Sequence, residues 1–183
     1  EEPRESLAYS SKALRNFVGL SAILIPVLLV FGGMLWTEGT DVQPSISAYF
    51  DTELRGVFVG LLLSIGFFFF SYGYKKLDKI LSSIAATLSL VVAVFPTTSC
   101  TKWVKEVHNV SAITFFILMA VFCLYLFRRY DKEKGLTEEK KNRNSFYTAM
   151  GILIIICVIW LIVDHFYIKA DGLIVLILEW IAL

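Results

Sequence analysis

Long apolar segments alternate with short polar segments over most of the chain. An α-helix rises about 1.5 Å per residue, so about twenty apolar residues cross the hydrocarbon core of a bilayer, which is about 30 Å thick. The pattern therefore predicts an all-α, polytopic transmembrane helix bundle with five full spans and a truncated sixth. The predicted spans are about 17–36, 55–74, 78–96, 107–127, 146–166 and 173–183.

The last predicted span, 173–183, has eleven residues and would reach about half-way through the hydrocarbon core. A free carboxylate at that depth would be costly, so we expect a sixth span that is cut off rather than one that ends inside the protein. The polar segments between the spans are too short for a separate soluble domain. A single transmembrane domain is therefore predicted over residues 1–183.

Lysine and arginine are distributed asymmetrically between the two sets of alternate polar segments. With the N-terminus inside, the inner segments hold thirteen of these residues and the outer segments hold four. Cytoplasmic loops carry the excess of basic residues, so the N-terminus is predicted to be cytoplasmic. The fifth span is expected to begin in the cytoplasm, with Thr137 as its N-cap, because acids follow Thr137 directly and bases come later.

Composition agrees with a membrane protein and narrows its functions. Hydrophobic residues make up 57% of the 183 residues, above the share usual for soluble domains, and the mean hydropathy is +0.70. The net charge of +1 excludes a strongly basic nucleic-acid-binding protein. Three cysteines and two histidines leave little for a disulfide framework or a metal centre, so we expect neither a metal nor a cofactor.

Small residues recur at helical spacing in the second and third predicted spans. Because lipid tails are as apolar as leucine, helices in a membrane associate through close packing and polar contacts, which small residues permit. We expect the two stripes to meet. They are Gly56, Gly60 and Ser64 in the second span, and Ser82, Ala86, Ser89 and Ala93 in the third.

Two ionisable residues are candidates for a site within the predicted spans. Glu179 lies about two turns into the last apolar segment, and Arg55 begins the second span on the same predicted side. Ionisable groups inside a bilayer are expensive and tend to pair, so we expect a buried Arg55–Glu179 pair. Alternatively, Arg55 extends to the outer headgroups and Glu179 meets a helix from outside this chain.

The segment 43–51 has apolar residues at about helical spacing, and Pro44 can occupy the first position of a helix. The segment is either a half-buried helical lid or an extended loop anchored by Tyr49 in the aromatic belt. Ser47 could act as a nucleophile only with a positioned base, and no Gly-x-Ser-x-Gly motif is present. The candidate site residues in this segment are Ser45, Ser47 and Tyr49.

Both histidines are predicted at outer ends of spans, with His108 at the start of the fourth and His165 at the end of the fifth. Together with nearby carboxylates they could bind zinc, which accepts such ligands. The spacing is not typical of a metal site, however, since Asp164 and His165 are adjacent and would point about 100° apart on a helix. Histidines that only form hydrogen bonds are therefore favoured.

Several short motifs occur together between about Ser45 and Glu179. They are Ser45–Phe50, Arg55–Gly60, Ile65–Gly66, Gly73–Tyr74, Asp78, Val94–Thr97, His108–Ala112, Phe115–Phe116, Arg143–Asn144, Tyr147 and Gly151. Taken together, they resemble a family of bacterial six-span membrane proteins known as a domain of unknown function. The resemblance implies a six-span bundle and no activity. It implies a common role for Ser45, Ser47, Tyr49, Arg55, Asp78, His108 and Glu179.

A second resemblance is to the alkaline ceramidase and adiponectin-receptor hydrolases, in which a Ser, an Asp and three His surround zinc in a seven-helix bundle. The chain departs from that pattern because it has two histidines and no His-x-x-x-His. Asp78 and His108 are also predicted on opposite sides of the membrane, where they could not share one metal.

The leading hypothesis is a multi-pass protein of a bacterial cytoplasmic membrane that acts as a binding, transport-accessory or complex subunit. Its polar pocket is expected on the outer side near Arg55, His108 and Glu179. The expected partners are membrane lipids and either further copies of the chain or another membrane protein, and not nucleic acid. The alternatives are a membrane-embedded lipid hydrolase and a small channel or transporter, and the sequence assigns no catalytic residue.

Overall fold

The computed structural model describes residues 2–36, 42–72, 75–97, 99–129, 137–164, 167 and 172–183. All regular secondary structure within these ranges is helical. The α-helices are α1 (Glu2–Trp36), α2 (Arg55–Phe70), α3 (Lys76–Val94), α4 (Lys102–Val121), α5 (Glu138–Val163) and α6 (Gly172–Ala182). A 3-10 helix, η1 (Ser47–Asp51), precedes α2, and a π-helix, η2 (Phe122–Leu126), continues α4.

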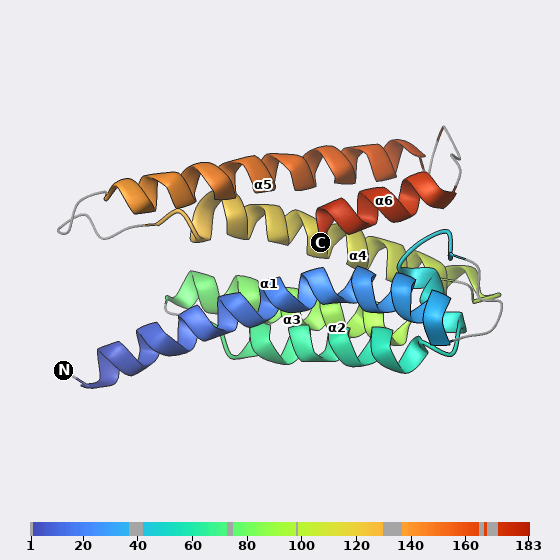
Figure 1. Cartoon of the computed structure of the whole chain (residues 1–183), viewed down its shortest axis with the longest axis horizontal. Coiled ribbons are helices and arrows are strands. Elements are labelled where there is room, and N and C mark those ends of the chain that lie inside the picture. Colours follow the sequence, from blue (N-terminus) through green and yellow to red (C-terminus); the bar gives the residue numbers. More distant parts are fainter. Residues whose placement is uncertain are drawn as a thin grey trace.

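Successive helices run in opposite directions along one long axis (Figure 1). Three of the described helices are long and apolar enough to cross a membrane, namely Lys76–Val94, Lys102–Leu126 and Glu138–Val163. The apolar helical segments Gly19–Leu35, Arg55–Phe70 and Gly172–Ala182 are shorter. The prediction of an all-α fold is therefore confirmed for the described residues, although α1, α4 and α5 begin at least five residues earlier than the predicted spans.

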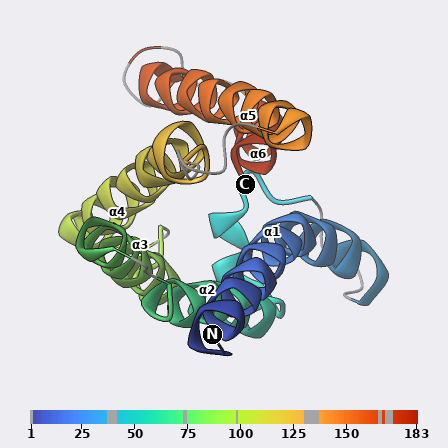
Figure 2. The same ribbon diagram turned by 90° about the vertical axis from the view of Figure 1, so that its left-hand side faces the viewer.

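Seen end-on, α1 to α5 form an arc, and α6 and η1 lie on its inner side (Figure 2). We call the end at which α3 and α5 begin the cationic end, because Lys76, Lys79, Arg128, Lys141 and Arg143 are exposed there. The opposite end carries η1 and the first residues of α2, α4 and α6 (Figure 1). From there α6 reaches only the middle of the bundle.

Helices α2 and α3 pack closely because α3 presents small residues to α2. Ser89 Oγ of α3 donates a hydrogen bond to the Leu62 carbonyl oxygen of α2 at 2.7 Å. Gly66 of α2 lies so close to α3 that a Cβ atom there would be 2.9 Å from Leu90 Cδ2 and 3.3 Å from the Ala86 oxygen. The predicted stripe of α3 is buried throughout, and its members are Ser82, Ala86, Ser89 and Ala93.

The predicted stripe of α2 does not take part in this interface. Gly56 and Gly60 are exposed, and a Cβ atom at either would meet nothing within 4 Å. Ser64 Oγ donates to the carbonyl oxygen of Gly60 in its own helix at 2.8 Å. Gly60 precedes the buried Leu62 by two positions, which is about 200° of rotation, so the stripe lies on the far side of α2. The expectation that Gly56, Gly60 and Ser64 meet α3 was wrong.

The segment before α2 is folded into the core. Ile46, Tyr49 and Phe50 are 6%, 1% and 5% exposed, and η1 begins directly after Ile46. A short helix is present in place of an extended loop, but it begins at Ser47 rather than at Pro44 and is buried in the core rather than half-buried. Tyr49 therefore lies inside the bundle and not in an aromatic belt.

Two local features organise the cationic end. Thr137 caps α5 as predicted, since its side chain accepts a hydrogen bond from the Lys140 backbone N–H at 3.2 Å. The Arg129 guanidinium forms an ion pair with buried Asp78, which ties the residues after η2 to the first turn of α3.

Candidate functional site

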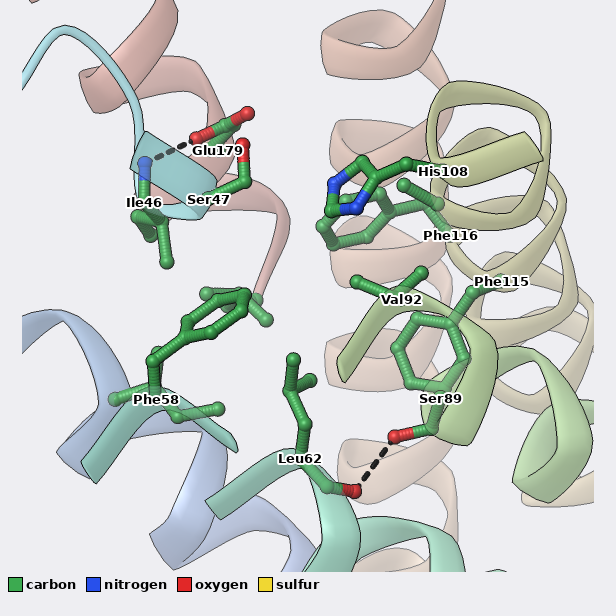
Figure 3. Close-up of a pocket in the computed structure, with 13 residues that line it drawn as sticks. Ile46, Ser47, Phe58, Leu62, Ser89, Val92, His108, Phe115, Phe116 and Glu179 are labelled. Atoms are coloured by element: carbon green, nitrogen blue, oxygen red, sulfur yellow. Dashed lines mark hydrogen bonds between the residues drawn. The ribbon is translucent and has the colours of Figure 1, made fainter. Parts of the chain in front are cut away.

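A small cavity with polar groups in its wall lies between α1, α2, α3, α4, η1 and α6, and we call it the polar cavity (Figure 3). Its volume is about 60 Å³. A buried water needs roughly 10–15 Å³ by this measure, so the cavity has room for a few waters or one small polar group. Four side chains with polar groups line it, namely Ser47, Ser89, His108 and Glu179. The apolar wall consists of Ile25, Ile46, Phe58, Leu62, Val92, Ala112, Phe115, Phe116 and Leu183.

Glu179 is brought to the polar cavity by α6, an otherwise apolar helix. Its Oε2 atom accepts a hydrogen bond from the backbone N–H of Ile46 at 2.6 Å. This bond joins α6 to the start of η1, where a helix leaves N–H groups without partners. Within the described residues the other carboxyl oxygen, Oε1, has no hydrogen bond, so it is available to a group in the cavity.

His108 reaches the polar cavity from α4, on the side facing Ser47 and Glu179 (Figure 3). The ring is 3% exposed, and Nδ1 lies 2.5 Å from the carbonyl oxygen of Phe95, just after the last turn of α3. A carbonyl oxygen only accepts, so Nδ1 carries a proton. In the neutral ring Nε2 is then a hydrogen-bond acceptor. The Val92 backbone is a second hydrogen-bonding neighbour of the imidazole.

The two serines of the wall differ in their availability. Ser89 already donates to Leu62 across the α2–α3 interface. The Ser47 hydroxyl lies 3.1 Å from the Ser45 hydroxyl, which also accepts a hydrogen bond from the Ala48 N–H. Either serine of the 45–47 pair can donate in their mutual bond, so Ser47 can still hydrogen-bond to a group in the cavity.

The structure brings only part of the predicted set together. Ser47, His108 and Glu179 line the polar cavity, and Ser45 contacts Ser47. Tyr49 is buried outside the cavity wall, where its hydroxyl accepts a hydrogen bond from the Gln43 N–H at 3.4 Å.

The expected Arg55–Glu179 pair is absent from this arrangement. The Arg55 guanidinium lies 4.0 Å from the centre of the Phe50 ring, in a cation–π contact at the surface. Glu179 instead uses a backbone N–H, because the segment before η1 comes between α6 and α2 (Figure 3). No sequence pattern indicates a backbone partner of this kind.

The residues proposed for zinc do not form a ligand set in the part of the chain that the structure describes. No group of three or more His, Cys, Asp or Glu there could hold a metal ion. His165 lies outside the described residues. Asp78 lies at the cationic end and His108 towards the opposite end, so they do not share a site.

The sequence pattern predicts Ser89 as a helix-packing residue only, and it does not indicate the apolar wall of the polar cavity. Helix α2 is apolar nearly all round, so the pattern of its residues does not indicate that Phe58 and Leu62 line the cavity. No protein-family model, no curated protein and no solved structure matches this chain. The geometry of the polar cavity is therefore the basis for assigning a function.

Proposed function

We propose that the chain is a multi-pass protein of a bacterial cytoplasmic membrane, with five full spans and its cationic end in the cytoplasm. The excess of Lys and Arg at that end supports this orientation. The apolar parts of α1 and α2 have 17 and 16 residues. At about 1.5 Å per residue they are close to the thickness of a bilayer core, and local thinning accommodates a small mismatch. The resemblance of the sequence to a family of bacterial six-span membrane proteins is compatible with this topology.

We further propose that the protein is a non-enzymatic binding subunit that holds a hydrogen-bond-donating group in the polar cavity. The observation that carries this proposal is the convergence of Glu179, His108 and Ser47 on one small space (Figure 3). Ionisable groups within spans are costly and mark functional sites. Among the described residues no Lys or Arg lines the cavity, and the polar atoms of its wall are mostly acceptors. A primary ammonium group of a membrane amphiphile suits such a wall.

Ethanolamine is the first probe, with choline as its matched control. Both are cations, but only ethanolamine has N–H donors. We expect ethanolamine to raise the Tm of the purified chain by several degrees at saturation, because a ligand at 100 times its Kd adds about 2.7 kcal/mol of stability. Glu179→Gln should abolish the shift, whereas Glu106→Gln, at an exposed site on α4, should keep it. Equal shifts with choline would contradict the proposal.

Lipid hydrolysis is the second candidate, because a hydroxyl, an imidazole and a carboxyl group face the same cavity. A nucleophile needs its base within hydrogen-bond distance. His108 and Ser47 are on facing walls without a mutual hydrogen bond, and Glu179 binds Ile46 rather than the imidazole. These contacts favour binding over catalysis. Phospholipid turnover that is lost in Ser47→Ala would reverse this preference.

A further inference from the structure

A second, larger cavity lies closer to the cationic end, and we call it the apolar cavity. Its volume is about 430 Å³, within the range of about 300–1,000 Å³ typical of ligand sites. It lies between α1, the end of α2, η2, the first half of α5 and the end of α6. Its wall is formed by Gly19, Ala22, Ile23, Phe69, Tyr72, Met119, Phe122, Cys123, Phe127, Phe146, Tyr147, Met150, Ile154, Trp180, Ile181, Ala182 and Leu183. No charged side chain is among them.

Helix η2 shapes one wall of the apolar cavity. The Phe127 N–H donates to the Phe122 carbonyl oxygen at 2.9 Å, which is the five-residue bond of a π-helix. The extra residue in this turn places both Phe122 and Phe127 in the wall, with ring centres 5.7 Å apart. Phe127 also contacts Tyr147 of α5, with ring centres 5.3 Å apart. The aromatic wall is therefore held by contacts of the protein itself.

Basic residues continue the cavity wall toward the membrane surface. The wall residues of α5 include Tyr147 and Met150, and Arg143 precedes Tyr147 by four positions, so it lies on the same helix face. The Lys140 ammonium group donates to the carbonyl oxygen of Phe127 at 2.7 Å, which places it beside the wall. Arg143 is exposed. The cavity thus has an apolar interior and a cationic rim.

We propose that the apolar cavity binds an acyl chain of an anionic phospholipid, with the lipid phosphate at Lys140 and Arg143. A basic pocket between membrane helices on the cytoplasmic side suits an anionic headgroup. The apolar wall suits the tail, and the rim supplies the complementary charge. This site is separate from the polar cavity, although Leu183 lines both. The inference concerns a different ligand from that of the proposed function.

Native mass spectrometry of the full chain in detergent tests this inference, with phosphatidylglycerol and phosphatidylcholine of identical acyl chains as probes. We expect the chain to retain phosphatidylglycerol in preference to phosphatidylcholine. Arg143→Gln should lower the affinity for phosphatidylglycerol by roughly five-fold. Lys141→Gln is the matched control, because it also removes one exposed positive charge. Lys141 lies about 200° around α5 from Arg143, so it is not on the same helix face.

A second variant tests the tail. Ala22→Trp fills the cavity without changing a charge, so it should reduce retention of both lipids. Arg143 is exposed, so its variant remains informative if Ala22→Trp does not fold. Equal retention of the two lipids by the unmodified chain would overturn the proposal, as would equal effects of Arg143→Gln and Lys141→Gln. Cross-linking of two chains through Cys123, which lines the cavity, would also overturn it in favour of a second copy.

Discussion

Glu179 shows how one residue can hold two elements together and also line a candidate binding site. One carboxyl oxygen accepts the N–H of Ile46, and the other is available to the polar cavity. Hydrogen bonds contribute about 0.5–1.5 kcal/mol each, and more where one partner is charged. The bond to Ile46 holds η1 against α6, and η1 carries Ser47 into the cavity wall. The position of the binding groups therefore depends on the structural role of Glu179.

Removing this acceptor should loosen the segment around η1. We expect Glu179→Leu to accelerate hydrogen exchange of the Ile46 amide by roughly ten-fold or more, because an unsatisfied buried N–H costs about 1–3 kcal/mol. Glu179→Gln keeps an acceptor oxygen and should have a much smaller effect. Exchange measured by mass spectrometry in detergent checks this, with Glu106→Leu as the exposed control. Unchanged exchange in Glu179→Leu would show that packing alone holds the segment.

Part of this residue-scale arrangement could be predicted from the sequence. Glu179 and His108 are conspicuous because polar groups are rare in apolar segments, and both line the polar cavity. Their hydrogen-bond partners are backbone groups of Ile46 and Phe95. Every residue has such groups, so no pattern of side chains identifies which one will be used. The prediction that Arg55 pairs with Glu179 was wrong for this reason.

At the level of elements, hydrophobic runs predict where helices lie but not how each helix is rotated. Helix α2 is apolar nearly all round, so amphipathicity does not determine its buried face. Either the stripe of Gly56, Gly60 and Ser64 or the face that carries Gly66 could have met α3. The bulky side chains of Phe58, Leu62 and Phe69 decide between these faces by packing inward. The π-helix η2 was likewise not predictable, because it follows from packing against α5 and not from a local motif.

Alanine at two glycines of α2 tests the observed rotation. Gly66→Ala should destabilise the protein by about 1–3 kcal/mol, because the new methyl group meets Leu90 and Ala86 of α3. Gly60→Ala meets no atom within 4 Å and should stabilise the helix by up to about 1 kcal/mol, from lower backbone entropy. Unfolding by a denaturing detergent gives both values. The reverse order would place the predicted stripe of Gly56 and Gly60 at the interface after all.

At the scale of the whole molecule, the excess of basic residues at one end and the positions of the two cavities distinguish the two ends of the bundle. The polar cavity is formed with η1, which belongs to the opposite end, whereas the apolar cavity extends toward the cationic end. A bilayer gives these locations different chemistry, because the cytoplasmic leaflet attracts basic segments and the apolar depth favours lipid tails. Once the orientation of the bundle is known, each proposed ligand site is therefore assigned to one side of the membrane.

Cysteine labelling with a membrane-impermeant thiol reagent measures that orientation. Native Cys100 is exposed at the opposite end, while Cys123 is half-buried and Cys157 is buried. We expect intact spheroplasts to be labelled at Cys100. In a Cys100→Ser background, Lys76→Cys and Lys141→Cys should react only after permeabilisation, because α3 and α5 begin at the same end.

The labelling has three outcomes, and they distinguish the topology of the bundle from its direction in the membrane. If the sites at 76 and 141 react from opposite faces, the chain between them does not form the two crossings of α3 and α4, and the bundle topology in the membrane fails. If both react from outside, the topology stands but its direction reverses. The apolar cavity would then face the outer leaflet. The negative potential of the cytoplasmic surface, which favours a cationic rim, is absent from that leaflet. Labelling from inside would leave the cationic rim beside the leaflet whose charge it complements.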